Sequence, residues 1–146
     1  MVLFLHIAFW LLFFGYKFLD LQPRLGTAHA LLLVGLPGCF NLAATYVHYF
    51  GLLPQLLRQR YIHYTGGLIA LFAIMVPARG WLEAQYLDGI FNSAYYTTWT
   101  LNRIISMIWN MASFMLFIAL LKFTIDRFEL AGRQKALENE KLTAEL

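Results

Sequence analysis

Four long apolar stretches occupy residues 1–121, and they constrain the fold more than any other feature of this sequence. The second stretch is the longest, because the chain contains no aspartate, glutamate, lysine or arginine from Leu25 to Leu57. A helix needs only about 20 apolar residues to cross a bilayer. The sequence is 60% hydrophobic and 13% charged, whereas soluble domains have roughly 45–50% apolar and ~25% charged residues. Too few polar residues are present to cover a soluble surface, so we predict an all-α integral membrane protein.

The apolar stretches predict a four-helix transmembrane bundle, with helices over residues 2–21, 27–50 and 61–77 and a fourth from 101 past 121. Pro37 falls inside the second helix and predicts a kink, because proline frees a backbone carbonyl there. The third and fourth helices are joined by a longer loop over residues 80–100. Its aromatic rings favour the membrane interface, either as an interfacial belt or as a lid or recognition surface. The aromatic residues of this loop are Trp81, Tyr86, Phe91, Tyr95, Tyr96 and Trp99.

The basic residues predict the orientation of the helices. Arg58 and Arg60 lie in the connection between the second and third helices, and five further basic residues follow residue 121. The positive-inside rule places this connection and both termini in the cytoplasm. Lys17 and Arg24 fall on the opposite side.

Two stripes of polar residues lie within the predicted spans, where polar groups often mark function. We expect the two stripes to face each other inside the bundle, with a hydrogen bond between Asn41 and Asn110. They serve either as hydrogen bonds between helices or as a ligand pocket or polar switch. The first stripe is Asn41, Thr45 and His48, and the second is Asn102, Ser106, Asn110 and Ser113. A stripe of small residues, Gly66, Ala70 and Ala73, predicts close packing of the third helix within the bundle or between subunits.

Catalytic and metal-binding patterns are missing from this sequence. The single cysteine, Cys39, lies in an apolar run where we expect it to be buried and inert. Of the four histidines only His48 and His63 lie at the matched depth that a pair of axial haem ligands needs, and no CxxCH, HExxH or carboxylate cluster supports a metal. We predict no catalytic residue, no metal and no cofactor in this chain. The composition also shows no nucleic-acid signature.

Residues 122–146 form a second region, a predicted cytoplasmic helix that continues the fourth span. It contains five basic and five acidic residues. Leu130, Leu137 and Ala144 follow one another at intervals of seven, with polar residues between them. This spacing predicts either a solvated helix or a parallel two-stranded linker with a weak coiled-coil seam.

Three segments resemble LytS-like membrane sensor histidine kinases of the Bacteroidetes type, which have four membrane helices. The segment RQKALENEKLTAEL at residues 133–146 is similar to the helix before the kinase core of that family. HIAFW at residues 6–10 is similar to its opening helix, and YVHYFGLLP at 46–54 with RQRYIHY at 58–64 to its junction between helices 2 and 3.

The resemblance implies that residues 1–121 are a transmembrane sensor domain and that residues 122–146 lead to a kinase core beyond Leu146. It further implies a homodimer in the bacterial inner membrane, surrounded by lipids, with ATP and magnesium in the kinase core and a response regulator as partner. No histidine of this chain matches the family's phosphoacceptor, so this part of the protein is expected to have no activity alone.

The mechanism we expect is that a stimulus shifts the fourth helix and the cytoplasmic helix passes the shift on, with Asn41, Asn110 and the Pro37 kink as the element that has two packings. The rival interpretation is a stand-alone small membrane protein, either a transporter subunit or an assembly factor.

Overall fold

The computed structural model describes residues 2–87 and 98–144, and side chains within 4–87 and 98–143. The helices are α1 (Val2–Leu25), α2 (Thr27–Val47), a π-helix (His48–Leu52), α3 (Leu53–Leu57), α4 (Tyr61–Tyr86) and α6 (Leu101–Ala144). No strand occurs in these described ranges. Four helical segments are long and apolar enough to cross a membrane: 4–25, 27–57, 61–86 and 101–143. The all-α prediction with four candidate spans is therefore confirmed.

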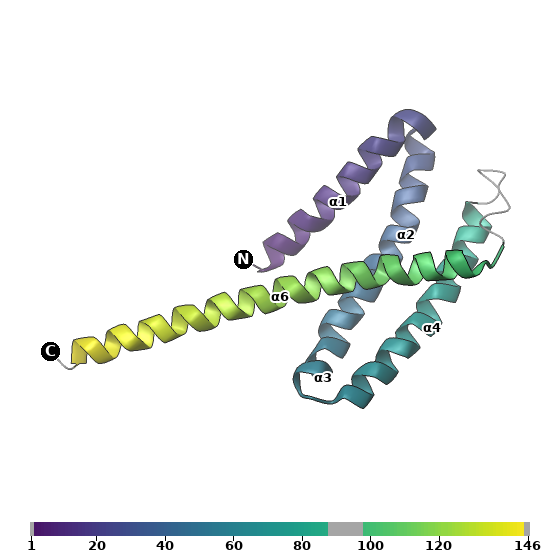
Figure 1. Ribbon diagram of the computed structural model, residues 1–146. Helices are drawn as coiled ribbons and strands as arrows, with labels where there is room; N and C mark the ends of the chain where they lie inside the picture. The colour runs from purple at the N-terminus through teal and green to yellow at the C-terminus, as the bar shows by residue number, and fades with distance from the viewer. Residues whose placement is uncertain (1, 88–97, 145–146) are drawn as a thin grey trace.

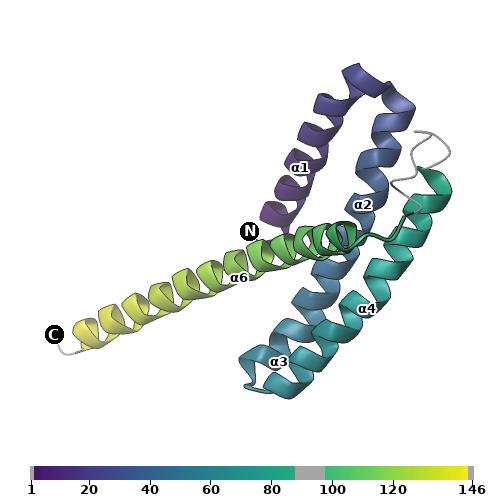
Figure 2. The same ribbon diagram turned by 45° about the vertical axis from the view of Figure 1, so that its right-hand side comes forward.

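The helices are arranged around a hairpin formed by α2 and α4 (Figures 1 and 2). The π-helix and α3 close one end of this hairpin, and α1 packs along α2. Helix α6 crosses α2 and α4 steeply and then projects away from the other helices as one long rod. The buried residues of α6 lie between Arg103 and Ile125, so the first part of the helix contacts its neighbours and the rest is exposed.

Two helices extend beyond their predicted ends. Helix α1 continues past its predicted end at residue 21 and ends only at Leu25, because Gly26 adopts a φ of 80° that glycine tolerates best. The second span is helical to Leu57 rather than to Phe50, since the π-helix inserts an extra residue and Pro54 sits in the first turn of α3. A proline at that position loses no helical hydrogen bond.

Helix α4 also runs further than the sequence predicted. It continues through Pro77, the expected end, as far as Tyr86. Residues 78–86 are therefore helical rather than part of a loop, which brings Arg79 and Glu83 onto one face. The expected aromatic loop is correspondingly shorter. Its residues Phe91, Tyr95 and Tyr96 lie outside the described residues.

The buried core lies where α2, α4 and α6 meet. Met107, Met111 and Met115 follow one another at intervals of four along α6 and pack against residues such as Ala44 and Leu71. Methionine side chains are flexible and fill the irregular space of a steep crossing. A second, aromatic contact joins α1 to α6, where rings of Phe9, Trp10 and Phe13 meet those of Phe114 and Phe117.

Candidate functional site

A buried charge cluster lies where α4 meets the start of α6. The Arg79 Nε donates a hydrogen bond to the Glu83 Oε1 at 2.7 Å, and an Arg103 terminal nitrogen donates to the Glu83 Oε2 at 3.3 Å. The side chains of Arg79, Glu83 and Arg103 are only 11%, 6% and 1% exposed. Charges buried this deeply are costly unless they are paired. Charges within membrane segments usually serve a function, so this cluster is the first candidate site.

Local sequence positions each member of the charge cluster. The spacing of four places Arg79 and Glu83 one helical turn apart. The guanidinium of Arg103 also donates to the carbonyl oxygens of Gly80, at 3.3 Å, and Thr98, at 3.2 Å. The Trp99 ring lies under this guanidinium, 5.6 Å from ring centre to charge, in cation–π geometry. A Cβ at residue 80 would collide with that ring, so only glycine permits this packing.

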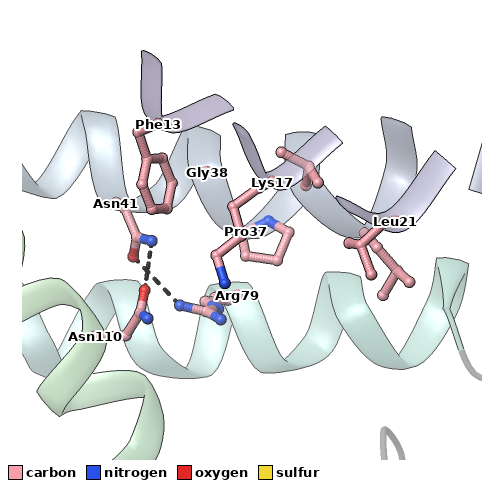
Figure 3. Close-up of a pocket in the computed structure, with 10 residues that line it drawn as sticks. Phe13, Lys17, Leu21, Pro37, Gly38, Asn41, Arg79 and Asn110 are labelled. Carbon is pink, nitrogen blue, oxygen red and sulfur yellow. Dashed lines mark hydrogen bonds between the residues drawn. The ribbon is translucent and has the colours of Figure 1, made fainter. Parts of the chain in front are cut away.

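The charge cluster is continuous with the predicted asparagine pair. The Asn41 Nδ2 donates to the Asn110 Oδ1 at 2.5 Å, which confirms the expected hydrogen bond between α2 and α6. The Asn41 Oδ1 in turn accepts a bond from an Arg79 terminal nitrogen at 3.3 Å. Figure 3 shows both bonds. A chain of polar contacts therefore links three helices, in the order Asn110, Asn41, Arg79, Glu83 and Arg103.

Two small cavities flank this chain of contacts. The first, of about 210 Å³, is lined by Lys17, Asn41, Arg79 and Asn110 together with apolar side chains (Figure 3). The second, of about 190 Å³, lies against Glu83, Arg103 and Ser106. Pro37 and Arg79 contribute to both cavities. Pro37, predicted as a kink, is thus part of the cavity walls, and α2 continues through it unbroken.

The charges around the two cavities do not balance. Lys17, Arg79 and Arg103 are cations, whereas Glu83 is the sole carboxylate among their described lining residues. Asp20, the nearest acid in sequence to Lys17, is paired with Arg24 on the surface at 3.2 Å. The arrangement therefore carries excess positive charge, which favours an anion rather than a metal ion.

The second polar stripe is only partly turned toward the other helices. Asn102, Ser106, Asn110 and Ser113 are all exposed, and the buried face of α6 passes through Arg103, Met107, Met111 and Met115. These two faces differ by one residue, or about 100° around the helix. The expectation that the whole stripe faces inward is therefore wrong.

Individual members of that stripe differ in their contacts. Asn110 lies at the edge of the contact between α2 and α6 and accepts the hydrogen bond from Asn41. Ser106 lines the second cavity. The Ser113 hydroxyl donates to the carbonyl of Trp109 in its own helix, at 2.7 Å.

The remaining residues of the first stripe lie toward the other end of α2. Thr45 is completely buried, and its hydroxyl has no hydrogen-bond partner among the described residues. The Nε2 of His48 lies 3.2 Å from the Tyr64 hydroxyl. His48 opens the π-helix and lines a mostly apolar cavity of about 220 Å³. Single-turn π-helices recur at functional sites, so this apolar cavity is a secondary candidate.

Several other predicted features face outward. Gly66, Ala70 and Ala73 are exposed, so they do not pack within this chain. Cys39 is exposed as well, and the prediction that it is buried is wrong because α2 turns this face away from its neighbours. Leu130 and Leu137 of the predicted signalling helix are more than half exposed, and the side chain of Ala144 lies outside the described residues.

Sequence reasoning missed the charge cluster because it placed Glu83 in a loop and Arg79 beyond the end of the third helix. The signal that was present is their spacing of four, with no helix-ending residue between Gly80 and Tyr86. Arg103 carried no signal, since its partner is 20 residues away in sequence.

Comparison of the chain with protein-family models, with curated proteins and with solved structures finds no match.

Proposed function

We propose that this chain is the transmembrane sensing and dimerisation module of a two-component sensor histidine kinase. The observation that carries the proposal is the single unbroken helix α6, 44 residues long, which begins in the charge cluster and ends in a charged, exposed helix. At 1.5 Å per residue it extends for about 66 Å. A rigid helix of this length transmits a movement at membrane depth to the cytoplasmic side. The resemblance of residues 133–146 to the helix before a kinase core supports this direction of signalling.

An exposed heptad series along α6 supports a parallel homodimer. Large apolar side chains recur at intervals of seven along α6 and are exposed, and two of them, Leu116 and Phe123, also line the apolar cavity beside His48. Their exposed fractions lie between 38% and 74%. The series comprises Trp109, Leu116, Phe123, Leu130 and Leu137. A coiled-coil seam uses two apolar positions per heptad, and this series supplies one, so it forms the weak seam expected from the sequence, against which we propose that a second copy of α6 packs in the same register.

The polar residues beside this seam support the same partner. The Ser113 hydroxyl is satisfied by the Trp109 carbonyl of its own helix, but Ser106, three residues before Trp109, is exposed at membrane depth. Lipid offers no hydrogen bonds to such groups. A second copy of the stripe supplies donors and acceptors at the same depth, at a modest gain of about 0.6–2 kcal/mol per bond.

Coupling in this proposal runs from the charge cluster into the seam. Arg103 and Asn110 attach α6 to α4 and α2, so a stimulus that changes these contacts shifts α6 as a unit. The shift alters the register or rotation of the two tails, which a weak heptad seam permits. A stimulus acts only through a preference for one of the two packings.

The remaining elements of the proposal come from the resemblance. The chain lies in the bacterial inner membrane with both termini in the cytoplasm, and ATP, magnesium and the response regulator belong to the kinase core. The excess of Arg58 and Arg60 between α3 and α4 supports this orientation.

Cysteine cross-linking tests the dimer. In a Cys39→Ser background, Leu130→Cys and Leu137→Cys are expected to form disulfide-linked dimers rapidly in membranes. Gly132→Cys and Asn139→Cys are matched controls, because they lie two residues further and about 200° around the helix. Equal cross-linking at all four positions, or none at Leu130 and Leu137, contradicts the proposed seam.

Autophosphorylation tests the kinase assignment. The full product of the source gene, reconstituted in liposomes with ATP and magnesium, is expected to incorporate acid-labile phosphate. Asn110→Leu is expected to change the basal or stimulated rate. Absence of incorporation from an intact gene product favours the rival, a stand-alone transporter subunit or assembly factor, and the two cavities then become candidate sites for its bound molecule.

A further inference from the structure

We propose that the cavity between Lys17 and Arg79 binds the phosphate group of an anionic membrane phospholipid. The inference concerns residues of this chain alone, and it holds or fails independently of any kinase core.

The hydrogen-bonding groups around this cavity are unevenly used. Both oxygens of Glu83 accept bonds, and so do the side-chain oxygens of Asn41 and Asn110. Donors remain, because Arg79 uses its Nε and one terminal nitrogen for the two bonds already described, out of five N–H groups in a guanidinium. A site with spare donors and occupied acceptors is complementary to an anion.

The charges favour the same ligand. The Lys17 side chain extends from α1 toward the Arg79 guanidinium (Figure 3). The nearby carboxylate of Glu83 already forms an ion pair with Arg79. Lys17 itself makes no hydrogen bond or ion pair within the described part of the chain. Two cations that face each other repel unless an anion lies between them. Phosphate oxygens satisfy both, with charge-assisted hydrogen bonds to lysine and arginine.

The size of the cavity limits how much of the ligand it holds. A volume of about 210 Å³ corresponds to about seven water molecules at ~30 Å³ each. Pockets that enclose a whole drug-sized ligand have ~300–1,000 Å³. The cavity therefore accommodates a head group, and the rest of the ligand lies outside it.

The surroundings identify that remainder as hydrocarbon. The walls beside the cations are the apolar side chains of Phe13, Leu21 and Val34. The adjacent outer surfaces of α1 and α2 are also apolar and exposed, with Leu19 at 69% and Leu31 at 57%. Lys17 is exposed as well, so the cavity opens onto the surface that acyl chains cover.

The depth of the two cations fits a phospholipid. Lys17 lies eight residues before the end of α1 and Arg79 seven before the end of α4. At 1.5 Å per residue, both are within about 12 Å of the helix ends. A lysine side chain at this distance from a helix end can reach the interface, where the phosphate groups of a leaflet lie, whereas the Arg79 side chain is held within the bundle by Glu83 and Asn41.

Native mass spectrometry of the whole chain in a non-ionic detergent tests the proposal. Phosphatidylglycerol is titrated, and retention of one lipid per chain gives an apparent affinity. Lys17→Gln is expected to weaken retention by about tenfold, since hydrogen bonds to charged groups contribute on that order. Lys17→Arg is expected to retain it. The control is Arg24→Gln, which removes a cation from the same end of α1 without touching the cavity and is expected to leave retention unchanged.

Three further arms distinguish the sources of the effect. Phosphatidylcholine, which carries no net charge, is expected to be retained less than phosphatidylglycerol. Equal loss of phosphatidylglycerol in Lys17→Gln and Arg24→Gln, or no loss in either, overturns the site. If inorganic phosphate at equal concentration displaces the lipid, the cavity binds free phosphate and the proposal of a phospholipid is overturned. Circular dichroism of each variant establishes that helix content is unchanged, and Lys17→Arg serves as a folded reference if Lys17→Gln loses helix.

Discussion

Removal of the Glu83 charge is the sharpest test of the buried charge cluster. Glu83 accepts bonds from Arg79 at 2.7 Å and Arg103 at 3.3 Å, and all three side chains are nearly inaccessible. In Glu83→Gln the two arginines keep their positions but lose the carboxylate between them. The free energy of unfolding is expected to fall because two buried cations then lack a counter-charge.

The size of that loss follows from the distances. With an effective dielectric constant of 20, the two attractions are about 6 and about 5 kcal/mol. Most of this is offset by the cost of removing three charges from water. Removal of one partner from a buried ion pair nevertheless costs about 3–5 kcal/mol, because the other charge stays buried. We therefore expect a loss in this range.

Unfolding in mixed micelles of a mild detergent and dodecyl sulfate, followed by circular dichroism, measures the effect. Asp20→Asn is the matched control, since Asp20 and Arg24 also pair at a spacing of four but are 44% and 72% exposed. Exposed pairs contribute only about 0–1 kcal/mol. A loss in Glu83→Gln no larger than in Asp20→Asn refutes the view that this cluster is buried and mutually dependent.

Three further outcomes follow from the same contacts. Gly80→Ala drives a methyl group into the Trp99 ring and is expected to lower the free energy of unfolding by about 1–3 kcal/mol. Gly66→Ala has open space around it and is expected to raise that free energy by up to about 1 kcal/mol. Equal effects of the two variants in thermal unfolding would contradict the packing of Gly80 against Trp99. Asn110→Leu removes the bond to Asn41 and is expected to lower stability by about 0.6–2 kcal/mol, so unchanged unfolding argues against that bond. Tyr64→Phe removes the hydroxyl beside His48 and is expected to cost about 0.6 kcal/mol, with a loss above 2 kcal/mol showing that the π-helix depends on it.

The span of each helix could be predicted only approximately, and the errors share a cause. The predicted helix ends at residues 21, 50 and 77 lie at or shortly before a proline, yet Pro23, Pro54 and Pro77 each lie inside a helix or in its first turn. A proline removes one hydrogen bond of a helix, which a long helix tolerates when its remaining bonds and packing hold it. Gly26 ended α1 as expected of a glycine with positive φ.

The candidate site could be predicted in part. Spacing alone placed Asn41 and Asn110 at matching depths, and they do bond. It failed for the whole stripe on α6, because periodicity shows which residues share a face but not which face a neighbour covers. The methionine face and the polar face are equally periodic, and the steep crossing of α6 selected the methionines.

The sequence by itself determined that the chain is helical, that four segments are apolar enough to span a membrane, and that a charged helix continues the fourth. These are properties of composition and local periodicity. Tertiary structure decided where the charges meet, since Glu83 and Arg103 come together only because α4 extends to Tyr86 and α6 begins beside it. It also left the heptad face of α6 uncovered. Contacts between residues far apart in sequence depend on helix ends and crossing angles, which no local pattern encodes.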